Sequence, residues 1–234
     1  MVSRCDVLAV GAHPDDVELG CGALLARLAA AGRAVGVADL TAGELATRGT
    51  PVVRRAEAAA AAAALGVAWR TCLDLGDGAL AGAAPVRLVE LIRGARPRVL
   101  LGPHGDDPHP DHADAARLVA RASFLSGVAK AFPDAGPAHR PGLVLLYAGP
   151  RQLLEPDLVV DVTACYASKR EALACFASQF GGDGPATHLA SGFFLAAVEG
   201  RDRAWGNLVG VELAEGLACP GALAADELAW LLGG

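Results

Sequence analysis

Residues 6–32, DVLAVGAHPDDVELGCGALLARLAAAG, say most about the architecture of this chain. Residues 6–12 form a continuous apolar run that ends in a polar turn, which is typical of a parallel strand covered on both faces. Residues 17–31 are rich in Ala and Leu and predict a helix, which Gly32 closes. Between the two, His13, Asp15 and Asp16 stand around Pro14, and crowded carboxylates are costly unless a cation neutralises them.

Strands and helices continue to alternate along the rest of the chain. The predicted strands are residues 35–41, 68–73, 98–103, 143–147 and 157–162, and the predicted helices are residues 51–65, 85–95 and 166–180. Residues 181–185, rich in Gly and Pro, predict a flexible connection. This alternation predicts an α/β fold with a Rossmann-like, mostly parallel sheet and helices on both faces, formed as a single domain over residues 1–234.

The composition argues against several classes of protein. The 234 residues are 53% hydrophobic, which suffices for a sizeable core. The formal net charge of −6 argues against binding to nucleic acid, which is itself negatively charged. There is no run of about eighteen uncharged apolar residues, so we expect no membrane partner. The first residues, MVSRCDVLAVGAH, lack the pattern of a signal peptide, and the six cysteines are scattered as expected of reduced thiols. We therefore expect a cytoplasmic protein.

A second polar cluster, LLGPHGDDPHPDHAD at residues 100–114, follows the fourth predicted strand. Because the carboxyl ends of parallel strands meet at one edge of an open sheet, the two clusters can converge there. His13 and Asp16 are three residues apart and so share one side of a helix turn. With His112 they would form a two-histidine, one-carboxylate metal site with an open position, the arrangement of catalytic zinc.

Asp15 is adjacent to Asp16 in sequence but points elsewhere, so it would be free to take a proton from water held at the open position, whose pKa the metal lowers. We interpret His104, Asp106 and Asp107 as part of a hydrated loop and place them outside the predicted site.

The motifs AHPDDVE (residues 12–18) and HPDH (residues 109–112) resemble the signatures of the LmbE/PIG-L-like family of zinc-dependent N-acetylglucosamine-conjugate deacetylases. TAGE (41–44), Arg54 with Glu57, LGDGAL (75–80), SQF (178–180) and GVELAEGL (210–217) are similar to the bacillithiol-pathway deacetylases, which act on N-acetylglucosaminyl malate. The resemblance implies a hydrolase that removes the N-acetyl group from a small-molecule N-acetylglucosamine conjugate. It also implies a homo-oligomer, a trimer or hexamer.

The same resemblance implies a role for each of eight residues. These are the zinc ligands His13, Asp16 and His112, the general base Asp15, the pair His109 and Asp111 that stabilises or protonates the reacting amide, and the sugar-hydroxyl ligands Arg54 and Asp77. We expect Asp111 to hold the His109 imidazole and raise its pKa. Family members often place a tyrosine near the site in the C-terminal third, whereas this chain has only Tyr147 and Tyr166.

The residues themselves leave alternatives open. The substrate could be another N-acetylglucosamine conjugate or a chito-oligosaccharide. The metal could be another divalent ion such as Fe²⁺, because the ion that occupies a site of nitrogen and oxygen ligands depends on which metals are available as well as on affinity. Arg54 alone could be a solvated helix arginine paired with Glu57, and Asp77 a turn residue. Malate carries two carboxylates, which predicts a cationic pocket supplied by Arg48, Arg55 or Arg151.

Two other classes of protein share part of this pattern. Two histidines and one carboxylate also describe the facial triad of non-haem iron oxygenases, but these typically sit on all-β barrels rather than on alternating strands and helices. A non-catalytic sugar- or nucleotide-binding module would need a loop that cradles phosphate, and no G-x-G-x-x-G follows the first strand.

Overall fold

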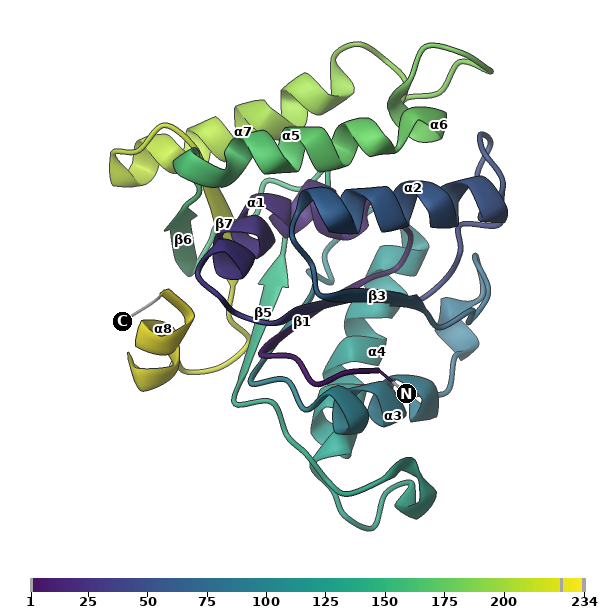
Figure 1. Cartoon of the computed structure of the whole chain (residues 1–234), viewed down its shortest axis with the longest axis vertical. Coiled ribbons are helices and arrows are strands. Elements are labelled where there is room, and N and C mark those ends of the chain that lie inside the picture. The colour runs from purple at the N-terminus through teal and green to yellow at the C-terminus, as the bar shows by residue number, and fades with distance from the viewer. Residues whose placement is uncertain (1, 224, 233–234) are drawn as a thin grey trace.

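The computed structural model describes residues 2–223 and 225–232 and is built around one seven-stranded sheet (Figure 1). The strand order is β3-β2-β1-β4-β5-β7-β6. The strands are β1 (Val7–Gly11), β2 (Val35–Asp39), β3 (Trp69–Cys72), β4 (Val99–Pro103), β5 (Leu143–Tyr147), β6 (Leu158–Asp161) and β7 (Ala214–Ala218). Strands β1 to β5 pair in parallel, while β7 runs antiparallel to both β5 and β6. The predicted α/β fold with a mostly parallel sheet is confirmed.

Helices cover both faces of the sheet. They are α1 (Asp16–Ala30), α2 (Pro51–Ala64), α3 (Val86–Ala95), α4 (Pro110–Ser126), α5 (Tyr166–Cys175), α6 (Ala177–Phe180), α7 (Phe194–Val209) and α8 (Ala225–Leu232), with short 3-10 turns at Leu80–Gly82, Pro133–Ala135 and Thr163–Cys165. Helices α3 and α4 pack together on one side, and α5 lies over α1 and α2 on the other (Figure 1). No helix in the described ranges has the length and apolar character to cross a membrane.

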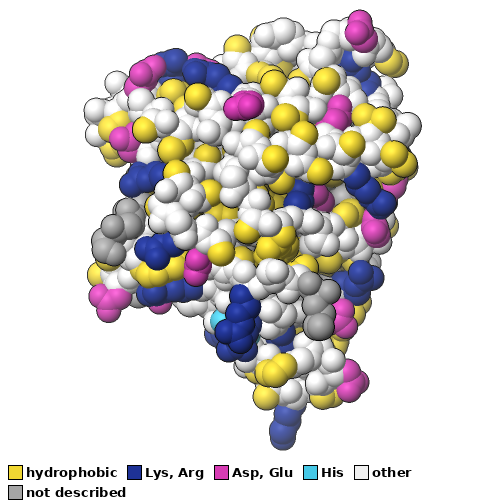
Figure 2. Space-filling model, in the orientation of Figure 1, with side chains coloured by type: hydrophobic (Ala, Val, Ile, Leu, Met, Phe, Trp, Pro, Cys, Tyr) yellow, Lys and Arg dark blue, Asp and Glu magenta, His cyan; other side chains and the backbone are white. Residues whose placement is uncertain are grey.

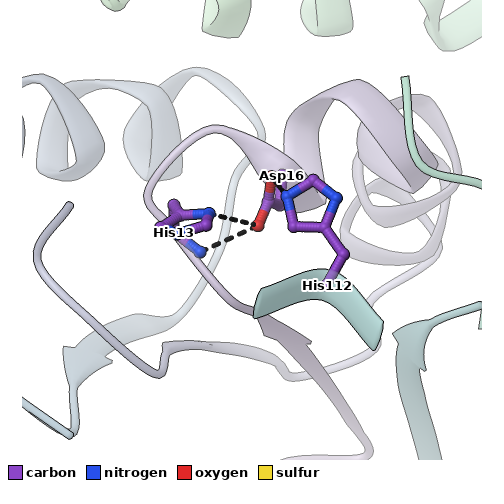
Figure 3. Close-up of side chains that lie close together, drawn as sticks. All are labelled: His13, Asp16 and His112. Carbon is purple, nitrogen blue, oxygen red and sulfur yellow. Dashed lines mark hydrogen bonds and ion pairs between the residues drawn. The ribbon is translucent and has the colours of Figure 1, made fainter. Parts of the chain in front are cut away.

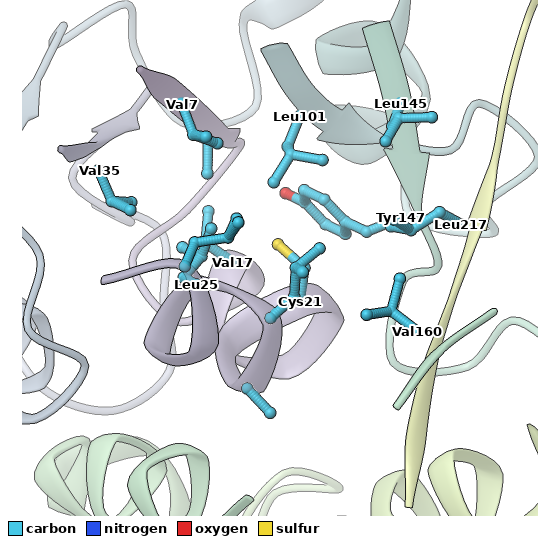
Figure 4. Packing of buried hydrophobic residues seen from close by; sticks show 14 of the residues in the cluster. Val7, Val17, Cys21, Leu25, Val35, Leu101, Leu145, Tyr147, Val160 and Leu217 are labelled. Carbon is cyan, nitrogen blue, oxygen red and sulfur yellow. The ribbon is translucent and has the colours of Figure 1, made fainter. Parts of the chain in front are cut away.

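Strand β1 separates two hydrophobic clusters. Val7 and Ala9 point into a cluster with Val17 and Tyr147 (Figure 4), whereas Leu8 and Val10 point into a second cluster on the opposite face. Successive side chains of a strand alternate between faces, and all five residues of β1 are buried. The predicted strand covered on both faces is therefore confirmed.

Helix α1 is interrupted at Cys21, whose backbone is not helical (φ −147°, ψ 21°). A Cβ on the preceding Gly20 would lie 2.1 Å from the Tyr147 ring, so glycine lets that ring pack directly against the helix. Beyond the break, the amides of Ala23 and Leu24 donate to the Glu215 carboxylate of β7 at 3.1 and 2.7 Å. The sequence predicts one continuous helix here, and the break reflects these two long-range contacts.

Glu215 belongs to a buried network of charged groups. The Lys169 ammonium, fully buried, lies 2.7 Å from Glu215 Oε1 and 2.7 Å from Asp202 Oδ2. Asp202 also accepts a hydrogen bond from Tyr166 and pairs with Arg201, whose Nη2 donates to the Leu19 carbonyl of α1. Opposite charges in contact offset the cost of burying each one. The network fixes α1 against α5, α7 and β7.

The predicted helix over residues 166–180 is wrong in one respect, because the chain turns at Phe176 (φ −83°, ψ 54°) and divides it into α5 and α6. Phe176 is fully buried at this turn. The turn brings Ser178 to α2, where its N–H and hydroxyl both donate to the Glu57 carboxylate at 2.7 Å. Glu57 is therefore engaged with Ser178, rather than with Arg54.

Candidate active site

The first part of the site is the turn between β1 and α1. Asp15 has a positive φ of 107°, which costs a residue other than glycine about 1–3 kcal/mol. The Arg54 guanidinium of α2 holds this turn, since its Nη2 donates to the Pro14 carbonyl and lies 3.1 Å from Asp15 Oδ2. Gly43 makes room for it, because a Cβ there would lie 1.8 Å from Arg54 Nη1. Arg54 is thus a buried partner of Asp15, not a solvated helix arginine.

The second part is the start of α4, where His109 occupies the N-cap position and His112 lies in the first turn. His112 Nε2 is 3.1 Å from Asp16 Oδ1, and His13 Nδ1 is 3.4 Å from Asp16 Oδ2 (Figure 3). The three side chains, from segments about a hundred residues apart, are buried together, with one donor atom each within 4.8 Å of the others.

These residues fit a divalent cation. Ligands of a tetrahedral zinc ion with bonds of about 2.0–2.1 Å stand about 3.3 Å apart, and each histidine lies at a similar distance from one of the two Asp16 oxygens, His13 from Oδ2 and His112 from Oδ1. Burial by itself lowers the pKa of His112, but the Asp16 and Asp107 carboxylates outweigh burial and raise it to about 10. Burial by itself raises the pKa of Asp16, yet His112 and His13 hold it well below the usual range. The carboxylates of Asp16 and Asp107 therefore stabilise positive charge between the two histidines and Asp16.

Asp15 has the properties of a proton acceptor. Its side chain is buried, and burial raises its pKa to about 7, although the positive charge of Arg54 opposes the rise. A base with a pKa near the working pH combines a useful ionised fraction with real affinity for a proton.

His109 stacks on His112, with ring centroids 4.5 Å apart, and meets His13 edge-on. Its Nδ1 is buried and has no hydrogen-bond partner within the described part of the chain. Burial lowers the pKa of His109, and the neighbouring His112 and His13 lower it further. The expectation of a raised pKa is therefore wrong for this arrangement.

The prediction that Asp111 contacts His109 is also wrong, because the described structure contains no hydrogen bond or ion pair between them. Asp111 Oδ2 instead accepts a hydrogen bond from the Gly78 amide at 2.7 Å and lies 3.4 Å from His13 Nε2. The first turn of α4 directs the Asp111 side chain toward the 75–80 loop rather than back over His109. Asp111 therefore supports His13.

Asp77 and Asp107 both contact a candidate metal ligand. Asp77 Oδ1 accepts a hydrogen bond from His13 Nε2 at 3.1 Å, and this bond keeps the pKa of Asp77 well below its usual range. Asp107 Oδ2 lies 3.1 Å from His112 Nδ1. The interpretation of Asp107 as a hydrated loop residue is therefore wrong. Asp107 stands two residues before His109, and its Oδ1 accepts a hydrogen bond from the His109 amide. An aspartate at this spacing often makes such a local turn, and this pattern could have indicated an ordered Asp107.

A cavity of about 600 Å³ opens over these residues, and all eight residues predicted for the site line it. Arg48 and Arg151 line it as well, but Arg48 donates to the Gly181 and Asp183 carbonyls. Arg55 pairs with Asp74 on the surface at 2.5 Å. Of the three arginines that line the cavity, Arg151 is therefore the exposed one. On the face shown in Figure 2, acidic and basic side chains are mixed rather than segregated.

Neither tyrosine lies in the cavity wall. Tyr147 donates its hydroxyl to the Val10 carbonyl in the core, and Tyr166 donates to Asp202. Phe194 lines the cavity instead. A step assisted by either tyrosine therefore has no support in this cavity.

Comparison with known proteins agrees with this geometry. The family model described as GlcNAc-PI de-N-acetylase (PIG-L) matches residues 8–123, which hold both motifs. A curated relative, 1D-myo-inositol 2-acetamido-2-deoxy-alpha-D-glucopyranoside deacetylase 2 of Catenulispora acidiphila, is 34% identical over 159 residues, or 53% of this chain and 52% of the relative. The matched segment thus spans about half the length of that relative.

Two solved structures share the fold over most of the chain. The conserved protein TT1542 from Thermus thermophilus is 35% identical, with a TM-score of 0.86 over 94% of this chain and 97% of that chain. The N,N'-diacetylchitobiose deacetylase from Pyrococcus horikoshii is 22% identical, with a TM-score of 0.80 over 96% and 85%, and shows the fold alone. With the PIG-L match across both motifs and this likeness along the whole sheet, the chain belongs to the PIG-L/LmbE family.

Proposed function

We propose that this protein is a metal-dependent hydrolase that removes the acetyl group from the nitrogen of an N-acetylglucosamine conjugate. The observation that carries the proposal is the placing of a buried base, Asp15, beside the His13, Asp16 and His112 donor set at the wall of one cavity. Deacetylation is also the activity in the printed name of the Catenulispora relative.

The residues of the chain divide the reaction between them. A divalent cation, zinc in our proposal, held by His13, Asp16 and His112 would lower the pKa of a water molecule and polarise the acetyl carbonyl. Asp15 takes a proton from the water that attacks this carbonyl, and Arg54 keeps the carboxylate in place. His109, in the cavity wall, stabilises or protonates the reacting amide. The carbon–nitrogen bond breaks, giving acetate and a free glucosamine.

For the group attached to the sugar we propose malate, as in the bacillithiol pathway. Arg151 supports this, because it lines the cavity, is exposed, and has no carboxylate within 4.0 Å among residues 2–223 and 225–232. An exposed cation in the cavity wall without a carboxylate partner favours an anionic substrate. The inositol glycoside in the name of the Catenulispora relative is the second candidate.

Two alternatives from other classes are less well supported. A facial-triad oxygenase consumes oxygen and an organic co-substrate, whereas the printed name of the Catenulispora relative is that of a deacetylase. A buried carboxylate whose pKa burial raises to about 7, beside a group of metal-binding side chains, is typical of a catalytic site rather than of a binding module.

Acetate release tests the proposal. The purified protein is incubated with N-acetylglucosaminyl malate, an N-acetylglucosaminyl inositol and N,N'-diacetylchitobiose, before and after chelation and again after Zn²⁺ or Fe²⁺ is restored. We expect acetate from at least one glucosamine conjugate, loss of release on chelation and recovery with metal. Metal-loaded protein that releases no acetate from any of the three would contradict the proposed function, and preference for the inositol glycoside would contradict malate.

A further inference from the structure

Each candidate metal-binding histidine contacts a second carboxylate on the ring nitrogen that faces away from Asp16. His13 Nδ1 faces Asp16, and its Nε2 lies 3.1 Å from Asp77 Oδ1. His112 Nε2 faces Asp16, and its Nδ1 lies 3.1 Å from Asp107 Oδ2. The Asp77 and Asp107 side chains are only 9% and 4% exposed. Figure 3 shows the two rings with Asp16 between them, and each ring has a further carboxylate, Asp77 or Asp107, beside its other nitrogen.

The two outer carboxylates are themselves fixed by the backbone in the same way. The second oxygen of Asp77 accepts a hydrogen bond from the Leu45 amide at 2.8 Å. The second oxygen of Asp107 accepts one from the His109 amide at 2.8 Å. Asp107 is also closely packed, since a Cβ on Gly149 would lie 1.9 Å from its Oδ2. Each carboxylate thus uses one oxygen as an anchor and places the other 3.1 Å from a histidine nitrogen, as a hydrogen bond for Asp77 and as an ion-pair contact for Asp107.

A neutral imidazole has one N–H and one lone pair, and a carboxylate can only accept. Once a cation takes the lone pair of the nitrogen beside Asp16, the nitrogen beside the outer carboxylate has to carry the proton. We propose that Asp77 and Asp107 are positioning residues that set the tautomer and orientation in which His13 and His112 bind the metal. This inference rests on the metal site of the proposed function, and it moves Asp77 from a sugar hydroxyl to a histidine.

Asp111 also approaches His13 Nε2, at 3.4 Å, so His13, Asp77 and Asp111 form a second group with donor atoms within 4.8 Å. The same nitrogen cannot donate its proton to Asp77 and present a lone pair to a cation. The inference therefore requires one metal ion per chain, bound on the Asp16 side of His13.

Metal affinity tests the inference without reference to turnover. The apoprotein is titrated with Zn²⁺ in competition with a chromophoric chelator, and Co²⁺ absorption spectra report the ligand geometry. We expect Asp77→Ala and Asp107→Ala each to weaken metal binding about 10–100-fold and to change the Co²⁺ spectrum. Asp77→Asn and Asp107→Asn keep an oxygen that accepts the ring N–H, so they should recover part of the affinity.

The matched controls remove a carboxylate from the same two loops. Asp74 pairs with Arg55, and the exposed Asp106 directly precedes Asp107, so Asp74→Ala and Asp106→Ala should bind Zn²⁺ like the wild type. Circular dichroism of each apoprotein shows that the fold is intact. Ala variants at 77 and 107 that match these controls would overturn the inference, as would binding of two ions per chain with loss of one in Asp77→Ala. For Asp77 alone, unchanged affinity with a raised KM would restore the sugar-binding role.

Failure of the proposed function gives a different result. If the wild-type protein binds Zn²⁺ with the predicted dependence on Asp77 and Asp107 but releases no acetate, the positioning role stands and the deacetylase proposal fails. If the wild-type protein binds no divalent metal, both the donor set and the roles of its supporting carboxylates are wrong.

Discussion

Arg54 Nη2 lies 3.1 Å from Asp15 Oδ2, and both side chains are about 95% buried. The pair joins α2 to the turn that follows β1, so a helix outside the donor set holds the base in position and opposes the rise in its pKa that burial causes. When both partners of an ion pair are buried, removing one of them is strongly destabilising, because the remaining charge is neither paired nor solvated.

The first prediction concerns the pH profile of Arg54 variants. The positive charge of Arg54 lowers the pKa of Asp15 against the larger effect of burial, which raises it to about 7. Removing that charge in Arg54→Gln should raise the pKa further and move the acidic limb of kcat/KM to higher pH. Arg54→Lys, which keeps a positive charge, should shift the limb less. An acidic limb that stays in place in Arg54→Gln would show that Asp15 does not control it.

The second prediction separates the base from the neighbouring ligand. Asp15→Asn is nearly isosteric and lies outside the donor set, so it should keep its metal while kcat falls about 10²–10⁴-fold. Asp16→Asn, which changes a carboxylate in contact with both histidines, should lose metal. Metal analysis beside steady-state kinetics measures both effects. Wild-type turnover in Asp15→Asn, or metal loss there but not in Asp16→Asn, would reverse the two assignments.

The third prediction distinguishes the two histidines of the HPDH motif. His112 faces Asp16 at 3.1 Å, so His112→Ala should lower the metal content and activity together. His109 stacks on His112 and has an unpartnered Nδ1 in the described structure, so His109→Ala should keep the metal and turn over slowly. Burial and the neighbouring histidines lower the pKa of His109. Any limb of the pH–rate profile that His109 contributes should therefore lie at a pH below the usual pKa of histidine. Full metal occupancy in His112→Ala with loss in His109→Ala is the contrary outcome.

The fourth prediction concerns stability rather than activity. Lys169 is fully buried between Asp202 and Glu215, so Lys169→Met leaves Glu215 without its cation and Asp202 with Arg201 alone. We expect a loss of about 3–5 kcal/mol in the free energy of unfolding, measured by urea denaturation. Its neighbour Arg170 makes an exposed ion pair with Glu199, and Arg170→Ala should cost less than about 1 kcal/mol. Equal effects of the two substitutions would contradict the role given to the buried network.

Much of the site could be predicted because its chemistry is concentrated in two short motifs after buried strands. The apolar run before His13 and the strand before the HPDH motif specify the sheet edge at which the motifs meet. The eight predicted residues consequently line one cavity, and β1, β2, α2 and β5 lie within two residues of their predicted bounds.

The remaining features depend on contacts that no local pattern carries. Asp77 reaches His13 across 64 residues, and its turn sequence is equally suited to a solvated loop. The sequence does not predict strand β7, because its second residue is Glu215 and a carboxylate is unfavourable in a buried strand unless a partner such as Lys169 neutralises it. The break in α1 likewise depends on Tyr147 and Glu215, both more than a hundred positions away.

The capping of α1 by Glu215 bears on the order in which the protein acquires its structure during synthesis. Glu215 follows Ala23 by 192 residues and lies in the strand of the sheet that leaves the ribosome last. A nascent chain of residues 1–123 contains both motifs and all of α1, yet its Ala23 and Leu24 amides lack this acceptor. The helix that presents Asp16 is therefore completed only when translation has passed β7, and a fragment that stops earlier should fray at Cys21.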